Sequence, residues 1–161
     1  NEIDVPPTLV SFAVDVAKIQ DVITPELKKA GNKLVWLRAP RDQYDLPDYA
    51  GIMDQYEKLH NDIQAGKVVS AYALDRHGIA AAVSKMAFGN ALGVKIEHNL
   101  DPRDFFAPGF GDIIMEVPAD KVGQLSITYT LIGEVTDDGK FSYGNTVITE
   151  KEAEEDLEIE M

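Results

Sequence analysis

The sequence contains no cysteine, which excludes disulfide bonds, thiolate zinc sites, iron–sulfur clusters and a cysteine nucleophile. It also lacks any apolar run close to the roughly 18 residues that a membrane-spanning helix needs. The phosphate-loop patterns G-x-G-x-x-G and G-x-x-x-x-G-K-[ST] and the nucleophile elbow G-x-S-x-G are missing as well. Composition and motifs therefore indicate no self-sufficient active site.

Positive charge is scarce, with 15 Lys and Arg against 28 Asp and Glu and a net charge of −13. Residues 150–161 hold seven acids and one lysine, so they carry −6 of this charge. The other 149 residues are moderately acidic, which argues against binding to nucleic-acid phosphates. We expect the acidic end to be a solvated tail or linker.

The chain reads as one globular domain, since 45% of its 161 residues are hydrophobic and 27% are charged. Its first residues, Asn1-Glu2-Ile3-Asp4, include neither a Met nor the features of a secretory signal. We therefore expect a fragment of a longer protein. Its predicted parts are a domain over residues 1–149 and the acidic tail or linker over residues 150–161.

Two longer helices and two short ones are predicted. Apolar periodicity indicates a helix from Ile52 to Ala65 that Gly66 ends. Its predicted apolar stripe consists of Ile52, Met53, Tyr56, Leu59, His60 and Ile63, and Asp62 belongs to the opposite, polar face. An alanine-rich helix is expected over Ile79–Phe88, where small residues permit close packing on a sheet. Caps and prolines predict short helices over Thr24–Gly31 and Pro118–Val122.

Runs of β-branched and apolar residues predict the strands. These runs are Thr8–Val16, Lys33–Leu37, Val68–Leu74, Val94–Ile96, Asp112–Val117, Leu131–Val135 and Lys140–Tyr143, with Val147 and Ile148 at an edge. Asp138-Gly139 predicts a hairpin between the last two runs, and residues 40–51 read as an exposed loop. The expected fold class is α+β, with one mixed sheet and helices. Trp36 and Phe88 are expected to be buried against the sheet.

The chemistry-bearing candidates are few. The three histidines, His60, His77 and His98, have no i, i+4 pair, so we expect no histidine metal site. Gly109-Phe110-Gly111 precedes a strand, which is the wrong side for a phosphate loop. Asp75-Arg76-His77-Gly78 joins a strand to the alanine-rich helix, a place that ligands favour. The alternative is a helix-capping Asp75 with two solvated neighbours.

Several segments, taken in order, resemble a known family. They are Pro6-Pro7-Thr8-Leu9-Val10-Ser11, Thr24-Pro25-Glu26-Leu27-Lys28, Ala30-Gly31-Asn32-Lys33-Leu34, Gly78-Ile79-Ala80, Ser84-Lys85-Met86-Ala87-Phe88-Gly89-Asn90-Ala91-Leu92-Gly93-Val94 and Ile132-Gly133-Glu134-Val135. Together they look like the C-terminal domain shared by aminoimidazole ribonucleotide synthetase and phosphoribosylformylglycinamidine synthase. The likeness runs from about Val5 to Tyr143, and it is greatest to the second half of the large single-chain synthase.

This resemblance implies a three-layer α/β/α sandwich around a mixed sheet, with partial likeness to the ferredoxin-like fold. It also implies a role in the fourth step of purine synthesis. In that step ATP activates the formamide oxygen of formylglycinamide ribonucleotide, and ammonia from glutamine replaces it. The implied cofactor of the parent enzyme is Mg-ATP.

The family has a strand-to-helix motif, His-Asp-x-Ser-Asp-Gly-Gly-Leu, in which the first Asp binds Mg²⁺ and the Ser touches nucleotide. Aligned through Gly78-Ile79, this chain has Ala73 at the metal-binding position and Asp75 at the Ser position. Lys85 replaces an acidic residue usual in the following helix. The resemblance therefore implies a degenerate, structural copy of the motif. Its candidate nucleotide contacts are Asp75, Arg76, His77 and Gly78, and we expect no catalytic residue or metal ligand.

The expected partners are other domains of the same parent chain, namely a synthetase-like half and a glutaminase domain. We expect no nucleic acid and no membrane as partners, no cofactor on this domain alone, and a cytoplasmic location. A fragment of a glutamine-dependent ligase that is inactive alone is the leading interpretation. The alternative is a non-catalytic binding or interaction domain that kept this fold.

Overall fold

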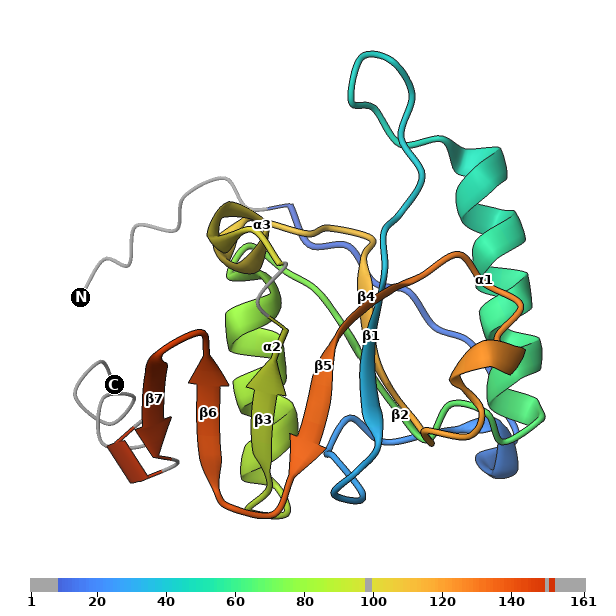
Figure 1. Cartoon of the computed structure of the whole chain (residues 1–161). Coiled ribbons are helices and arrows are strands. Elements are labelled where there is room, and N and C mark those ends of the chain that lie inside the picture. The colour runs from blue at the N-terminus through green and yellow to red at the C-terminus, as the bar shows by residue number, and fades with distance from the viewer. Residues whose placement is uncertain (1–8, 98–99, 150, 153–161) are drawn as a thin grey trace, which may run out of the picture.

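Seven strands form one mixed sheet with helices on both faces (Figure 1). The computed structural model describes residues 9–97, 100–149 and 151–152. The strands are β1 (Lys33–Leu37), β2 (Ser70–Ala73), β3 (Gly93–Ile96), β4 (Ile113–Val117), β5 (Thr130–Thr136), β6 (Lys140–Tyr143) and β7 (Thr146–Thr149). The helices are α1 (Tyr49–Gln64), α2 (Gly78–Phe88) and α3 (Pro102–Phe106), with 3₁₀ turns at Ile19–Asp21 and Val122–Gln124.

The strand order is β2-β4-β1-β5-β3-β6-β7. Every neighbouring pair is antiparallel except β3 and β6, which are parallel. β1 therefore lies inside the sheet, between β4 and β5. This position explains why its four last residues, Leu34 to Leu37, are all buried.

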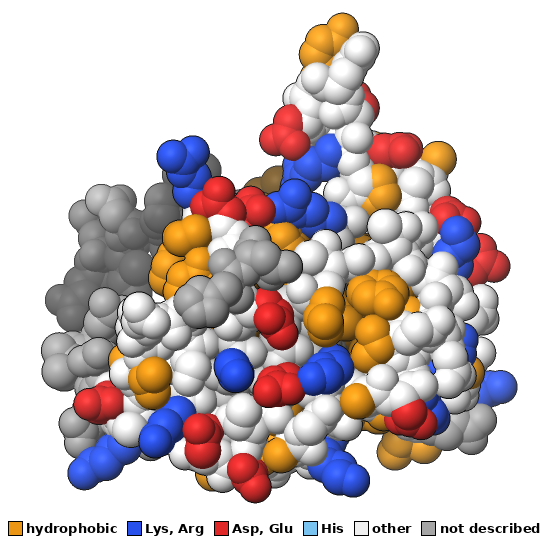
Figure 2. Space-filling model, in the orientation of Figure 1, with side chains coloured by type: hydrophobic (Ala, Val, Ile, Leu, Met, Phe, Trp, Pro, Cys, Tyr) orange, Lys and Arg blue, Asp and Glu red, His pale blue; other side chains and the backbone are white. Residues whose placement is uncertain are grey.

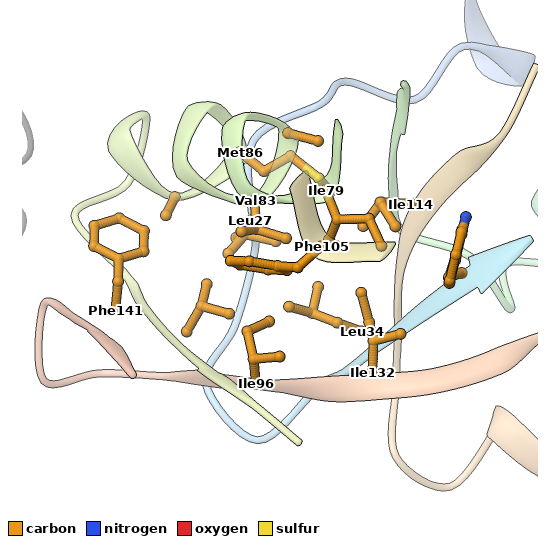
Figure 3. Packing of buried hydrophobic residues seen from close by; sticks show 14 of the residues in the cluster. Leu27, Leu34, Ile79, Val83, Met86, Ile96, Phe105, Ile114, Ile132 and Phe141 are labelled. Atoms are coloured by element: carbon orange, nitrogen blue, oxygen red, sulfur yellow. The ribbon is translucent and has the colours of Figure 1, made fainter. Parts of the chain in front are cut away.

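The core is divided by the sheet into two clusters, one on each face. Along β1, Leu34 and Trp36 point to the cluster under α2, and Val35 and Leu37 point to the cluster that includes Leu59 of α1. Figure 3 shows the α2 side, where Ile79, Val83 and Met86 of that helix face Leu34, Ile96 and Ile132 of the strands. Helices thus cover both faces, and the predicted three-layer α/β/α arrangement is confirmed.

Helix α1 begins three residues earlier than predicted, because Asp48 caps it by accepting a hydrogen bond from the Gly51 N–H at 3.2 Å. Three expected orientations on this helix are wrong. Met53 and His60, placed on the apolar stripe, are exposed, and Asp62, placed on the polar face, is 1% exposed. Asp62 is turned inward because it accepts hydrogen bonds from Lys67 and from the backbone of Ser126.

The predicted strand over residues 8–16 is wrong where the structure describes it, from Leu9 onward. Leu9 to Val16 form no helix or strand, and their side chains are exposed. A strand requires a neighbour that pairs with its backbone groups, and none of the described strands pairs with this segment. Apolar, β-branched composition alone does not supply such a neighbour.

The predicted helix over Thr24–Gly31 is also wrong, and residues 24–31 form a bend and a turn. The backbone N–H groups of Lys28 and Lys29 donate to the carboxylate of Glu116, at 2.7 and 3.0 Å. The side-chain amide of Asn32 donates to the same carboxylate at 2.6 Å. Since Glu116 is fully buried in β4, these contacts take the amide groups that a helix would use, and they fix the loop to the sheet.

The predicted hairpin at Asp138-Gly139 is wrong in its pairing, because β3 lies between β5 and β6 (Figure 1). The loop between β5 and β6 passes the first residue of β3, Gly93. A Cβ at Gly93 would meet Thr136 Oγ1, Asp138 Oδ1 and, at 2.7 Å, the carbonyl oxygen of Lys140. Glycine is therefore needed for the loop to cross the start of β3.

The short helix predicted over Pro118–Val122 is wrong as well. Residues 119–121 form a turn, and a 3₁₀ turn follows at Val122–Gln124. The predictions of β1, α2, β3, β4 and an edge strand that includes Val147 and Ile148 are confirmed. Among the described residues, no helix combines the length and the apolar character that crossing a membrane requires.

Candidate functional site

A polar cavity of about 610 Å³ lies where β1 ends and β4 begins. Its walls come from the end of β1, the loop after it, α3 and the loop that leads into β4. The lining residues are Trp36, Arg38, Ala39, Arg41, Asp45, Leu74, Asp104, Ala107, Pro108, Gly109, Phe110 and Asp112. Leu74 directly follows β2 and precedes Asp75, so the cavity adjoins the strand-to-helix motif.

Asp112 is the buried acid of this cavity, with 6% of its surface exposed. Its two carboxylate oxygens accept hydrogen bonds from Trp36 Nε1, at 3.0 Å, and from the Ala39 backbone N–H, at 2.9 Å. Burial raises the pKa of Asp112, although these two hydrogen bonds and the nearby Arg41 and Arg38 act in the opposite direction. The site thus combines a desolvated carboxyl group with two guanidinium groups.

The two arginines of the cavity are held in different ways. Arg38 lies over the ring of Trp36, with its Cζ 4.1 Å from the ring centroid, and it forms an ion pair with Asp104 at 2.7 Å. Arg41 donates to the carbonyl oxygens of Asp45 and Phe110, at 3.1 and 3.3 Å. A guanidinium has five N–H donors, so both side chains can bind a small anion beside these partners.

The predicted site residues Asp75, Arg76, His77 and Gly78 lie between β2 and α2. Asp75 Oδ1 accepts a hydrogen bond from the His77 backbone N–H at 2.7 Å, and His77 Nδ1 lies 3.0 Å from the same oxygen. Lys85 Nζ of α2 lies 3.9 Å from the other oxygen. The His77 N–H bond is the largest of the effects that lower the pKa of Asp75. Asp75 is thus held by His77 and Lys85.

Arg76 is exposed, and its Nε donates to His77 Nε2 at 3.1 Å, so it reaches Asp75 only through His77. His77, rather than Asp75, occupies the N-cap position of α2, and its side chain makes no capping hydrogen bond. Gly78 is buried with a φ of +70°, and a Cβ there would meet the Phe105 carbonyl oxygen at 3.0 Å. Gly78 therefore allows α2 and the end of α3 to pack closely.

The residues at this strand end do not fit a bound Mg²⁺. Ala73, at the position where the resemblance implies a metal ligand, offers only a methyl group, and Mg²⁺ requires oxygen donors. The exposed carboxylate nearby, that of Asp75, already has cationic and N–H partners. Across the part of the chain that the structure describes, no three His, Asp or Glu side chains are placed to share a metal ion. His98 lies outside the described residues.

Sequence reasoning missed the cavity residues Arg38, Arg41 and Asp112. Arg38 follows a predicted strand and Asp112 was assigned to one, but neither belongs to a recognisable motif. Trp36 and Asp112, which line the cavity and are joined by a hydrogen bond, are 76 positions apart. Only the antiparallel pairing of β1 with β4 brings them together.

A second, apolar cavity of about 330 Å³ lies between α2, α3 and the β6–β7 hairpin. Phe105, Phe141 and Tyr143 contribute aromatic walls, and the rings of Phe105 and Tyr143 are stacked with centroids 5.2 Å apart. Ser84, Ser142 and Thr146 add hydroxyl groups. This cavity suits a small apolar molecule rather than a phosphate.

Comparison with known proteins gives similarity in sequence and in fold. No family model matches the sequence. The PurL subunit of phosphoribosylformylglycinamidine synthase from Lactobacillus delbrueckii is 27% identical over 73 residues, which are 45% of this chain and 10% of that protein. The match thus spans about a tenth of the length of this curated relative.

The solved structures that resemble this fold include enzymes of the same name. Thermotoga maritima PurL complexed with AMPPCP superimposes with a TM-score of 0.68 at 14% identity, over 84% of this chain and 27% of that one. Escherichia coli HypE, a hydrogenase maturation protein, gives a TM-score of 0.60 at 17% identity, over 80% of this chain and 51% of that one. The chain thus has the fold of a domain like that of PurL and aminoimidazole ribonucleotide synthetase, as the resemblance implied.

Proposed function

We propose that this chain is one domain of a phosphoribosylformylglycinamidine synthase, and that it serves as a structural rather than a catalytic copy of the nucleotide site. The parent enzyme would convert formylglycinamide ribonucleotide to formylglycinamidine ribonucleotide with ATP and glutamine. Residues 1–149 would form the synthetase-related domain, and residues 150–161 an acidic tail or linker toward a following domain. The location would be cytoplasmic.

Two findings support membership of such an enzyme. The sequence similarity is to a PurL subunit, and the fold covers about a quarter of PurL from Thermotoga maritima. Structures of that protein are complexed with ATP and FGAR, which the proposed reaction consumes, and with ADP, which an ATP-dependent reaction releases. The remaining parts of the enzyme, a synthetase-like half and a glutaminase domain, would be the partners of this domain.

The proposal of a structural copy rests on the residues at the end of β2 and just after it. Ala73 cannot ligate Mg²⁺, and Asp75 presents a negative charge where the family's Ser would approach a phosphate. Lys85 lies 3.9 Å from that carboxylate and offsets part of its charge, and the His77 backbone N–H donates to it. Without a metal ligand, this end of the sheet attracts a triphosphate less strongly than the family's motif does.

The residues of the polar cavity support binding of a small polar group in place of catalysis. Arg38 and Arg41 present positive charge beside the buried Asp112. Such a set can hold and orient a small anionic or zwitterionic group through hydrogen bonds. Among the described residues that line it, no nucleophile lies beside a base, which agrees with a positioning rather than a catalytic role.

Calorimetric titration of the chain with Mg-ATP tests the proposal. We expect a dissociation constant weaker than about 0.1 mM. The double variant Ala73→Asp, Asp75→Ser restores the family's two side chains and should bind more tightly, while Asp75→Ser alone is the matched control without the metal ligand. Micromolar affinity of the unchanged chain would refute the structural copy. Loss of such binding in Asp75→Ala would identify Asp75 as a replacement ligand.

The alternative is a non-catalytic binding domain that kept this fold. The apolar cavity beside Phe105 and Phe141 favours it, because a cavity with aromatic walls can hold a small apolar molecule. The gene distinguishes the two interpretations. A reading frame that continues past Met161 into a glutaminase domain supports the ligase, and a stop codon there supports the binding domain.

A further inference from the structure

The segment before the first sheet strand exposes an unusual amount of apolar surface. Leu9, Phe12, Val14, Val16 and Ile19 are each between 87% and 93% exposed. Isolated apolar side chains are normal on a protein surface, but a continuous series of this kind marks an interaction site. Covering these apolar side chains with another protein surface removes them from water and is therefore favourable.

The order of these side chains is that of a half-buried strand. Phe12, Val14 and Val16 alternate with Ala13 and Asp15, so an extended backbone places the three large apolar groups on one face. β-Branched and aromatic residues are the ones that strands favour. The composition therefore suits a strand with one apolar face.

The backbone of this segment has no strand partner in the described part of the molecule. Leu9 to Val16 appear as coil in Figure 1, and the seven strands pair only with one another. The side chain of Asp15 accepts a hydrogen bond from the adjacent Val16 N–H at 2.7 Å, which is a local contact. An extended segment with open N–H and C=O groups can add to the edge of another sheet.

We infer that Leu9–Val16 is a strand that adds to a β-sheet edge in another domain of the same longer protein, with Phe12, Val14 and Val16 against the apolar face of that domain. This inference rests on the proposed function, which supplies the other domain. The curated relative is matched over 10% of its length and the solved one over 27%, so proteins of this kind contain ample further chain.

A second copy of the chain is a less suitable partner for this segment than another domain of the same protein. The segment and a sheet edge such as β7 are different surfaces, so copies joined through them would form an open-ended series. A sheet in the same protein is tethered, and the tether raises the effective concentration of the strand. Charged side chains interrupt the apolar ones on the exposed face of the sheet (Figure 2), where Lys33 pairs with Glu134 and Lys95 is exposed.

Hydrogen–deuterium exchange of the parent protein and of the 161-residue chain tests the inference. We expect the amides of residues 9–16 to exchange freely in the chain and at least about 100-fold more slowly in the parent. In the parent, Phe12→Asp with Val14→Asp should abolish this protection, and Ser11→Asp should leave it. Protection of the β4 amides in every sample verifies that the variants are folded.

Three results would overturn the inference. They are free exchange of residues 9–16 in the parent, protection in the 161-residue chain that rises with its concentration, and a gene that encodes no further domain. Ligase activity of the same parent, measured separately, distinguishes this failure from failure of the proposed function. If residues 9–16 are protected but the parent has no ligase activity, the strand is supported and the proposed function is refuted. If the parent is active but residues 9–16 exchange freely, the proposed function is supported and the strand is refuted.

Discussion

Trp36 connects the core with the polar cavity. Its ring belongs to the cluster under α2, and its Nε1 donates to the buried Asp112. Trp36 is 6% exposed, which confirms its predicted burial, whereas Phe88 is only partly buried. A single side chain therefore supports both packing and the orientation of the cavity's carboxyl group.

Replacing Trp36 by Ala should lower the free energy of unfolding by about 3–5 kcal/mol, because a cavity forms and Asp112 loses a donor. Chemical denaturation measures the loss. Trp36→Phe is the matched control, since it keeps an aromatic ring but not the N–H, and should cost about 1–2 kcal/mol. A loss below about 1 kcal/mol for Trp36→Ala would contradict the observed packing.

Asp62 provides a pH-dependent contribution to stability. Burial acts to raise its pKa, but hydrogen bonds from Lys67 and Ser126 outweigh burial and hold the pKa below the ordinary value of 3.8. A lowered pKa means that the unfolded chain takes up a proton more readily. Asp62 therefore stabilises the folded chain at pH values above its pKa in the unfolded chain. This stabilisation is lost as the pH falls toward the lower pKa that Asp62 has in the folded chain.

The variant Asp62→Asn should be less stable than the unchanged chain by about 1–3 kcal/mol at pH 7, and this difference should shrink as the pH falls through 4 toward 2. Denaturation at a series of pH values gives both curves. Asp54→Asn, on the exposed side of the same helix, is the control with little expected effect. A constant difference across the pH range would show that Asp62 does not act through its charge.

At the scale of elements, the crossing of the β5–β6 loop over the start of β3 determines how the sheet continues to β6 and β7. Gly93 has no side chain at the point where Thr136 and Asp138 approach. Thr136 Oγ1 donates to Asp138 Oδ1 at 2.6 Å, and the Lys140 N–H donates to the same oxygen at 3.2 Å, so the loop is held together internally.

Gly93→Ala should therefore destabilise the protein by about 1–3 kcal/mol or more, because the new methyl group overlaps this loop. Gly123→Ala is the control, since a Cβ at Gly123 meets no atom within 4 Å. Thermal unfolding compares the two variants. Equal stability of Gly93→Ala and Gly123→Ala would mean that the loop can shift without cost.

At the scale of the whole molecule, the proposed function requires domains that this chain does not contain. The sequence has no cysteine for a glutaminase, and Ala73 stands where the resemblance implies a metal ligand. The chain alone should therefore form no detectable formylglycinamidine ribonucleotide from formylglycinamide ribonucleotide, ATP and ammonia. The assay compares it with an active synthase under the same conditions, and measurable product from the chain alone would refute the structural role.

The sequence by itself determined the elements whose signals are local. The apolar run of β1, the periodicity of α1 and the small residues of α2 each correspond to an observed element, because short-range sterics and amphipathicity suffice to specify them. The resemblance to the family also predicted the three-layer arrangement, without reasoning about any particular contact between distant residues.

The tertiary structure decided what depends on residues far apart in the chain. Residues 24–31 carry helix signals, yet the buried Glu116, more than 80 positions away, binds their amide groups. Asp138-Gly139 carries a hairpin signal, yet β3 takes the place beside β5. Trp36 and Asp112 meet only because β1 pairs with β4. A desolvated carboxylate and a completed strand ladder outweigh local propensities of a few tenths of a kcal/mol per residue, which is why the loops and the cavity could not be predicted.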